Sequence, residues 1–194
     1  MPRIYIGIGS NRGARALNIR RGLQLLAERG FRILKQSPIY ETDPMNMPGA
    51  RKFLNAVVEA ETRLSPDACL GAFREVEVRL GRPTRHPRYA PRSLDLDLLL
   101  YDRVVRRPSR ASPGKALEGR EKGEGRRDEF RTSSFRLPAA ACCLLPHPEM
   151  HRRAFVLVPL ADIAPNLVHP VLHRRISTLL KEIPREGVRR WPNN

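Results

Sequence analysis

Apolar and polar positions along the first hundred residues follow two different periods. Segments with the apolar residues of strands cover residues 4–8, 31–42, 53–62 and 94–101. Two longer stretches repeat apolar side chains every three or four positions, which is typical of amphipathic helices, and they cover residues 14–28 and 65–80. The pattern therefore predicts a strand, a helix, two strands, a helix and a strand, in that order.

This order of elements is that of a ferredoxin-like α+β sandwich (βαββαβ), in which two helices cover one face of an antiparallel sheet. The other face then needs a cover from later in the chain. An apolar segment at 154–165 and an amphipathic helix predicted at 172–183 can supply it as added C-terminal segments. We expect residues 1–194 to form a single domain.

The stretch from about residue 106 to residue 142 interrupts the pattern. It is rich in Gly, Pro, Ser and charged residues and has no apolar periodicity. Such a composition cannot bury a core, so we expect a long, flexible, basic insertion. Its deletion should leave the fold and the activity largely intact.

The formal net charge of the 194-residue chain is +16. A balance this basic favours a nucleic acid, an anionic membrane or an anionic substrate as partner. An RNA-binding module is therefore an alternative interpretation. Two observations count against it: the charge does not sit in one tract, and the predicted strands offer few aromatic side chains for base stacking. No window approaches the ~18 apolar residues of a membrane span, and the N-terminus lacks an apolar signal-peptide core, which predicts a soluble, cytoplasmic protein.

Three patterns that often carry chemistry are weak in this chain. Cys142 and Cys143 are adjacent and Cys69 stands alone in a helical pattern, so we expect reduced thiols rather than disulfides or a metal site. Residues 7–13 read G-x-G-x-x-x-G, one position too long for a dinucleotide-binding turn. Residues 147–151 contain two histidines, but the glutamate is misplaced for a zinc-protease helix.

The most specific chemistry lies at the fourth predicted strand. Asp95 and Asp97 are two positions apart, so their side chains point to the same face of a strand, while the leucines between and beside them point to the other. Adjacent carboxylates repel each other unless a cation lies between them, and Mg²⁺ typically binds one or two carboxylates together with substrate phosphates. Upstream are four arginines suited to phosphate oxygens: Arg82, Arg85, Arg88 and Arg92. A solvated polar strand edge is the plainer interpretation of the aspartates alone, but the arginines favour phosphoryl transfer.

A set of short motifs carries a resemblance to a known family. The longest is Arg88-Tyr-Ala-Pro-Arg92-Ser-Leu-Asp95-Leu-Asp97-Leu-Leu. The others are Gly9-Ser-Asn11, Tyr40-Glu-Thr42-Asp-Pro44, Phe53-Leu-Asn55, Leu80-Gly-Arg82, Pro146-His147, Arg153-Ala-Phe155 and Val158-Pro-Leu-Ala-Asp-Ile-Ala-Pro165. In these motifs the chain resembles the 6-hydroxymethyl-7,8-dihydropterin pyrophosphokinases of folate biosynthesis, over roughly residues 1–105 and 144–183.

The resemblance implies a monomeric enzyme that transfers the β,γ-pyrophosphoryl group of ATP to the pterin hydroxymethyl oxygen and releases AMP, with no membrane and no specific nucleic acid as partner. Asp95 and Asp97 would bind two Mg²⁺ ions that bridge the ATP phosphates. The catalytic guanidiniums would be those of Arg82, Arg92 and Arg153. The ATP-binding residues would be Arg85, Arg88, Tyr89, His147 and Glu77. The pterin-binding residues would be Thr42, Pro44, Met45, Phe53, Asn55 and Phe155, with the two phenylalanine rings on either side of the pterin.

The chain departs from the family pattern in several places. Thr84 stands where a second loop arginine is common, and Arg85 is its expected replacement; Tyr89 stands where tryptophan is common. Residues 142–145 lack the arginine and threonine that relatives can offer to ATP. Glu77, assigned to the ATP side, also has a simpler interpretation as a surface acid. The presence of both aspartates and all three catalytic arginines argues against an inactive relative.

Overall fold

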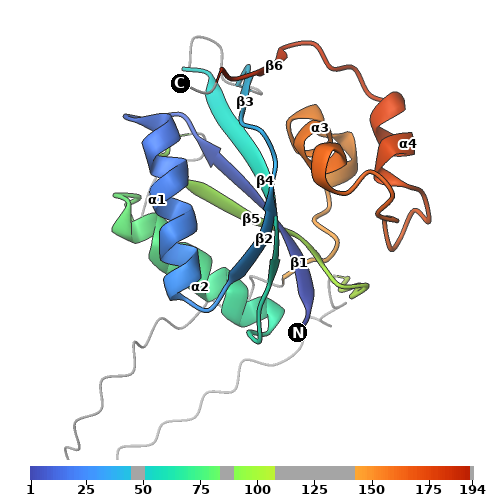
Figure 1. Ribbon diagram of the computed structural model, residues 1–194, viewed down its shortest axis with the longest axis horizontal. Coiled ribbons are helices and arrows are strands. Elements are labelled where there is room, and N and C mark those ends of the chain that lie inside the picture. Colours follow the sequence, from blue (N-terminus) through green and yellow to red (C-terminus); the bar gives the residue numbers. More distant parts are fainter. Residues whose placement is uncertain (45–50, 84–89, 108–142, 193–194) are drawn as a thin grey trace, which may run out of the picture.

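The computed structural model of the chain describes residues 1–44, 51–83, 90–107 and 143–192. In these residues one sheet is formed by β1 (Arg3–Ser10), β2 (Arg32–Gln36), β3 (Tyr40–Thr42), β4 (Phe53–Glu61), β5 (Asp95–Tyr101) and β6 (Val188–Arg190). The helices are α1 (Arg15–Glu28), α2 (Pro66–Arg79), α3 (Ala154–Ile163) and α4 (Ile176–Lys181), with a short 3-10 helix at Met150–Arg152. Figure 1 shows the sheet between α1 and α2 on one side and α3 and α4 on the other.

The strand order is β5-β1-β4-β3-β6, and β2 also pairs with β4. Every pairing is antiparallel. The prediction of a single strand over 31–42 is wrong in one respect, because Ser37 and Pro38 divide this segment into β2 and β3. The Ser37 hydroxyl accepts a hydrogen bond from the Val57 backbone N–H at 3.0 Å, and Pro38 has no N–H to continue the ladder. β2 and β3 therefore follow one another along β4.

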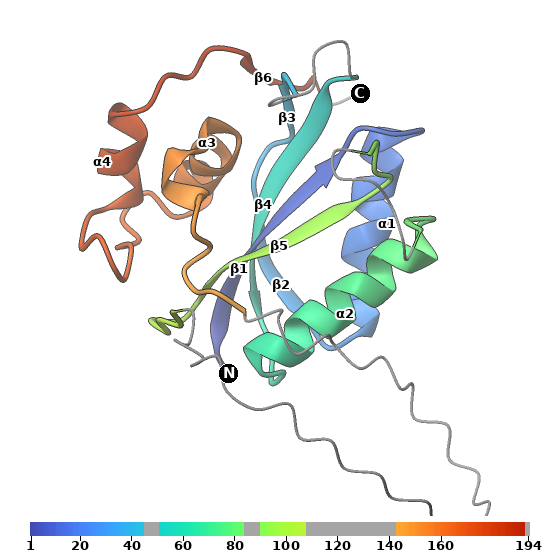
Figure 2. The ribbon, with the colours of Figure 1, turned by 180° about the vertical axis from the view of Figure 1, so that it is seen from behind.

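Two apolar cores lie on the two faces of the sheet. The turned view in Figure 2 shows the helices that cover each face. Under α1 and α2, Phe31 and Phe73 pack with ring centroids 5.5 Å apart, beside the buried Leu94, Leu96 and Leu98. Under α3 and α4, a smaller core joins strand side chains such as Val57 and Leu99 to Leu157, Leu160 and Ile176. The prediction that later segments cover the second face is confirmed.

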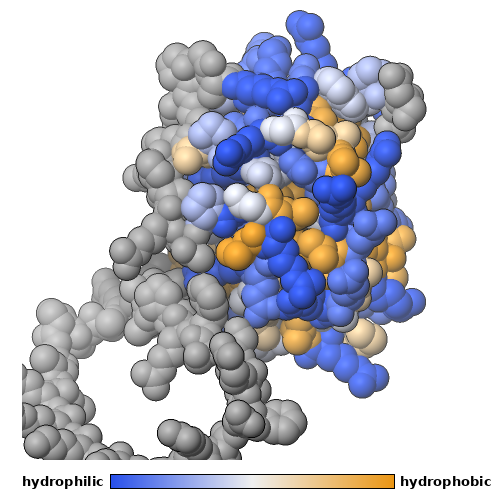
Figure 3. Space-filling view, turned by 90° about the vertical axis from the view of Figure 1, so that its left-hand side faces the viewer, coloured by the Kyte–Doolittle hydropathy of each residue, from blue (hydrophilic) through white to orange (hydrophobic). Residues whose placement is uncertain are grey.

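The two helices predicted at 14–28 and 65–80 begin and end within one residue of the expected positions. The Ser65 hydroxyl caps α2 by accepting a hydrogen bond from the Ala68 N–H, and Pro66 occupies the first turn. Gly81 follows α2 with φ +87°, a conformation that side chains with a Cβ rarely adopt. Seen from the side of α1, the surface is mostly hydrophilic, with an apolar area near its middle (Figure 3).

The C-terminal part differs most from the sequence-based prediction. The helix expected at 172–183 is limited to Ile176–Lys181, because His169 forms a turn in which its Nδ1 accepts hydrogen bonds from the backbone N–H groups of Val171 and Leu172. The strand β6 was not predicted. It pairs with β3 and brings Trp191 close to Arg15 at the start of α1.

The insertion predicted from about 106 to 142 lies, from residue 108 on, outside the described residues. Arg106 itself is described, and its backbone exchanges two hydrogen bonds with Leu145. Within the described ranges, no helix is long and apolar enough to span a membrane.

Candidate active site

One row of residues across the sheet organises the site. Gly9 on β1 lies opposite Asn55 on β4 and opposite Asp95 on β5, and Tyr40 on β3 lies opposite Asn55 on its other side. Two positions back along β1, on the same face of the sheet, Gly7 lies opposite Asp97. Since neighbouring strands are ~4.8 Å apart, the backbones of Asn55 and Asp95 lie about two strand spacings apart, and Gly9, which has no side chain, lies between them.

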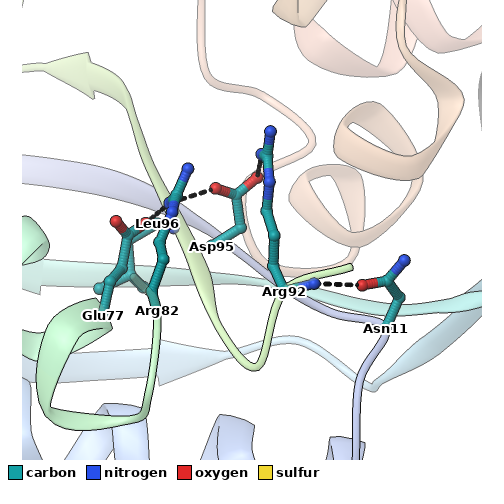
Figure 4. Close-up of polar contacts among 6 residues, drawn as sticks. All are labelled: Asn11, Glu77, Arg82, Arg92, Asp95 and Leu96. Carbon is teal, nitrogen blue, oxygen red and sulfur yellow. Dashed lines mark hydrogen bonds and ion pairs between the residues drawn. The ribbon is translucent and has the colours of Figure 1, made fainter. Parts of the chain in front are cut away.

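The Asp95 carboxylate is held by two guanidiniums. Arg82 Nη1 lies 2.8 Å from Asp95 Oδ1, and Arg92 Nη1 lies 2.6 Å from Asp95 Oδ2 (Figure 4). The side chains of all three residues are partly exposed. The predicted convergence of an aspartate and arginines at one strand mouth is therefore present for Arg82 and Arg92, each on a different carboxylate oxygen.

Glu77 connects this cluster to the edge of the sheet. Its side chain comes from α2, on the opposite face, and its Oε1 accepts a hydrogen bond from the Leu96 N–H at 2.8 Å and contacts Arg82 Nη1 at 2.6 Å. The interpretation as a surface acid is wrong, because Glu77 is only 5% exposed. It satisfies a backbone donor on edge strand β5, and that donor belongs to the residue between the two aspartates (Figure 4).

Two titratable groups in the site have shifted pKa values. Burial, followed by the negative charge of Asp95, raises the pKa of the Asp97 carboxyl to about 6, against the opposing effect of Arg153 and Arg92. Burial of Glu77 raises the pKa of its carboxyl to about 7, although Arg82 acts in the opposite direction. A cation bound next to the Asp97 carboxyl would favour its charged form.

His147 and Arg153 approach the aspartates from the α3 side. The backbone N–H of His147 donates to Leu99 on β5, and Arg153 occupies the N-cap position of α3. Burial and the nearby Arg153 lower the pKa of the His147 imidazole. Its Nδ1 accepts a hydrogen bond from the Glu149 N–H at 3.2 Å, so the neutral ring carries its proton on Nε2.

The predicted pterin residues lie at the other end of the row. Asn55 Nδ2 donates to the Thr42 hydroxyl at 2.7 Å, and both residues are buried. Phe53 and Phe155 are half-buried, on β4 and α3, two elements that pack together. The Arg153 guanidinium lies 5.7 Å from the Phe155 ring centroid, which joins the two halves of the site.

Four residues assigned from the resemblance lie outside the described part of the chain: Met45, Arg85, Arg88 and Tyr89. Pro44 is described and half-buried, immediately before the first gap. Two residues that received no individual role do shape the site. Gly9 lies between its two halves, and Asn11 binds the backbone of Arg92 through its Oδ1 (2.7 Å) and its own N–H (3.1 Å). The sequence signal for both residues was the Gly9-Ser-Asn11 motif at the end of the first strand.

The chemistry that these groups can perform follows from their charges. Within the described ranges, no three His, Cys, Asp or Glu side chains form a group that could hold a metal ion alone. Asp95 and Asp97 nevertheless provide the oxygen ligands that Mg²⁺ prefers, and Mg²⁺ usually completes its shell with water and phosphate oxygens. The carboxylate pair therefore fits a metal that arrives with a phosphate-bearing substrate.

An antiparallel α+β fold with this cluster of carboxylates and guanidiniums is typical of proteins that act on phosphate groups. The model of the family "7,8-dihydro-6-hydroxymethylpterin-pyrophosphokinase (HPPK)" matches residues 5–165. The chain belongs to this family.

Similar proteins include some of about the same length as this chain and some that are several times longer. The chain is 34% identical to a 2-amino-4-hydroxy-6-hydroxymethyldihydropteridine pyrophosphokinase of Pseudomonas aeruginosa, covering 99% of this chain and 98% of that protein. It is 32% identical to the Bacillus subtilis protein of the same name, over 96% and 89%. It is 32% identical to the folic acid synthesis protein fol1 of Schizosaccharomyces pombe, of which it spans only 21%.

Solved structures support the fold. The HPPK-DHPS protein of Plasmodium falciparum superimposes with a TM-score of 0.65 at 14% identity, covering 98% of this chain and 47% of that one. Asp95, Asp97 and the described arginines thus lie on a scaffold shared with this structure.

Proposed function

We propose that the protein transfers the terminal pyrophosphoryl group of ATP to 6-hydroxymethyl-7,8-dihydropterin in the synthesis of folate. The hydroxymethyl oxygen attacks the β-phosphorus, and the bond from that phosphorus to the oxygen bridging the α- and β-phosphates breaks. AMP leaves with the bridging oxygen, and the hydroxyl proton is released. The single observation that carries this proposal is the row Asn55–Gly9–Asp95, which separates an amide suited to a pterin edge from a cluster suited to phosphates.

Asp95 and Asp97 are the proposed ligands of two Mg²⁺ ions. When bound, these ions would neutralise the phosphates and stabilise the attacking and leaving oxygens of an in-line displacement. Burial and the negative charge of Asp95 raise the pKa of Asp97 to about 6. A cation bound between the two carboxylates would offset this repulsion, which supports the proposed metal site.

The two arginines on Asp95 are the proposed anchors of the transferred group. A polyphosphate competes with Asp95 for Arg82 and Arg92, because guanidiniums bind phosphate and carboxylate oxygens with the same geometry. The exchange would free Asp95 for metal binding, while Glu77 keeps Arg82 in place through its contact at 2.6 Å. Arg153 and the Nε2–H of His147 would add positive charge and a donor from the α3 side.

Recognition of the pterin is assigned to the other half of the row. The Asn55 amide can both donate to and accept from the edge of a pterin, and its bond to Thr42 at 2.7 Å fixes its orientation. Phe53 and Phe155 present flat apolar surfaces from β4 and α3. Gly9, which has no side chain, lies between Asn55 and Asp95 of the phosphate cluster.

The test is conversion of ATP to AMP with and without 6-hydroxymethyl-7,8-dihydropterin and Mg²⁺, for the wild type and for Asp97→Asn. AMP formed only with pterin and metal, and lost in the variant, would support the reaction and the metal ligand. Asp67→Asn is the matched control, since Asp67 is an exposed aspartate paired with Arg106 on the surface. Absence of AMP from folded wild-type protein would contradict the proposal.

We also propose a ferredoxin-like topology and a monomeric state. If β2 and β3 count as one interrupted strand, the antiparallel order becomes fourth, first, third, second, which is the order of the split βαβ motif. Sedimentation or light scattering at micromolar concentration tests the monomer, for which a dimer mass would be the contrary result.

A further inference from the structure

Arg15 occupies an unusual place for a cation. It is the first residue of α1, whose first turn has no acidic residue and whose N-cap makes no side-chain hydrogen bond. The N-terminus of a helix carries partial positive charge, so an arginine here is unfavourable unless other groups compensate. The Arg15 side chain is only 9% exposed, which shows that it is directed into the protein rather than into solvent.

Arg15 contacts three segments that are distant in sequence. Its Nη2 lies 3.0 Å from Glu41 Oε1 on β3. Its Nη1 donates to the backbone carbonyl of Lys52 at 2.7 Å. Its guanidinium carbon lies 5.1 Å from the ring centroid of Trp191, just after β6. One side chain therefore binds the ends of two central strands and the C-terminal segment.

The two strand ends that Arg15 joins carry the pterin residues. Glu41 immediately precedes Thr42 in β3, and Lys52 immediately precedes Phe53 in β4. Thr42 lies directly opposite Phe53 in the β3–β4 pairing. A displacement of either end would change the bond between Thr42 and Asn55, which has 2.7 Å between its heavy atoms.

The C-terminal segment supports β3 from the other side. β6 pairs with β3, and the Trp191 N–H donates to the Ile39 carbonyl at 2.8 Å. Near the same place, Lys52 Nζ and Asp43 Oδ1 form an ion pair at 2.9 Å between the two strand ends. Arg15, the Asp43–Lys52 pair and β6 thus act on the same short part of the sheet.

We propose that Arg15 is a positioning residue for the pterin half of the site. It holds the ends of β3 and β4 at the spacing at which Thr42 and Asn55 bond, and Trp191 stacks on its guanidinium from the C-terminal segment. The inference rests on the proposed function, because it assigns pterin binding to these two residues. The phosphate half lies across β1, and none of the three Arg15 contacts given above involves it.

The experiment compares steady-state kinetics for both substrates in Arg15→Met, Arg15→Lys and the wild type. Arg15→Met removes both polar contacts, so KM for the pterin should rise about ten-fold, the effect of losing charge-assisted hydrogen bonds. KM for ATP and kcat at saturation should change less than about two-fold, since additivity holds for distant groups. Arg15→Lys keeps the charge near Glu41 and should recover part of the pterin affinity.

Arg32→Met is the matched control. Arg32 pairs with Glu61 at the far end of β4, so its loss removes an arginine–glutamate pair without touching the pterin residues. It should leave both KM values unchanged. An equal rise of both KM values in Arg15→Met, or no rise in either, would overturn the inference.

Equilibrium binding of the pterin, measured by calorimetry with a non-hydrolysable ATP analogue present, separates this inference from the proposed function. If the wild type binds no pterin, the proposed function and the inference both fail. If the wild type and Arg15→Met bind it equally well, only the inference fails. If Arg15→Met does not fold, Arg15→Lys and Trp191→Leu carry the same test, with the same direction and a smaller expected rise in KM.

Discussion

Gly9 and Asn55 approach so closely that a single added carbon would disturb the site. A Cβ built on Gly9 would lie 2.9 Å from Asn55 Oδ1, closer than such contacts normally are, and 3.9 Å from the Cβ of Asp95. The glycine is therefore required by its neighbours. Its backbone lies between the pterin half and the phosphate half of the candidate site.

Replacement of Gly9 by alanine should weaken pterin binding more than ATP binding. The methyl group pushes the Asn55 amide away from Thr42, and loss of an oriented amide hydrogen bond corresponds to about a ten-fold rise in KM for the pterin. Gly71→Ala is the control, because a Cβ at Gly71 meets no atom within 4 Å. Unchanged pterin kinetics in Gly9→Ala would show that the close approach of Gly9 to Asn55 has no role in pterin recognition.

Replacement of Glu77 by glutamine should flatten the pH dependence of stability. The pKa of Glu77 is about 7 in the folded protein, against the ordinary value of 4.5 for a glutamate in the unfolded chain, so the folded protein binds more protons between these values. The contribution of Glu77 to stability is therefore complete below pH 4.5 and is lost as the pH rises through 7. The loss is on the order of 3 kcal/mol at most.

Urea unfolding of wild type and Glu77→Gln at acid and neutral pH measures this effect. Other titrating groups are common to both proteins, so the difference between the two curves isolates Glu77. A difference that does not change with pH would mean that the ion pair with Arg82 keeps Glu77 charged throughout.

Replacement of Asn11 by alanine should lower kcat with a modest loss of stability. The Asn11 side chain holds the Arg92 backbone N–H at 2.7 Å, where the chain enters the strand of the two aspartates. Loss of this bond should cost about 1–2 kcal/mol and misplace the Arg92 guanidinium. Asn18→Ala removes a comparable amide-to-backbone bond, to the Arg12 carbonyl at 2.9 Å, on the exposed start of α1. Equal kcat values for the two variants would argue against the role of Asn11.

The two amide substitutions of His147 should differ in their effect on ATP. Glutamine places its amide nitrogen near the position of Nε2, which is the proposed donor to phosphate, whereas asparagine resembles the Nδ1 side that accepts from Glu149. We expect KM for ATP to rise about two- to three-fold in His147→Gln and about ten-fold in His147→Asn. The reverse order would assign the contact with ATP to Nδ1.

Much of this protein was predictable from local sequence. The periods of apolar residues placed β1, β4, β5, α1 and α2 nearly correctly, because burial on one face of an element depends on spacing alone. The same rule put Asp95 and Asp97 on one face and Leu96 on the other, and Arg92, three residues before Asp95, was expected at the same strand mouth. The assignment of both halves of the site depended on the resemblance of these motifs to a family.

The remaining features depend on contacts between distant residues. Ser37 interrupts the strand predicted over 31–42 because its hydroxyl accepts a hydrogen bond from the Val57 N–H of β4. β6 has a charged sequence with no apolar period, and it is a strand only because β3 offers an unpaired edge. Glu77 is buried because the Leu96 N–H and Arg82 meet it there. Sequence alone determined which residues could form elements and carry the chemistry, since both depend on side-chain type and spacing. Tertiary structure alone decided which polar groups are buried and paired, since a polar group becomes stable in the interior only when a partner arrives from elsewhere in the chain.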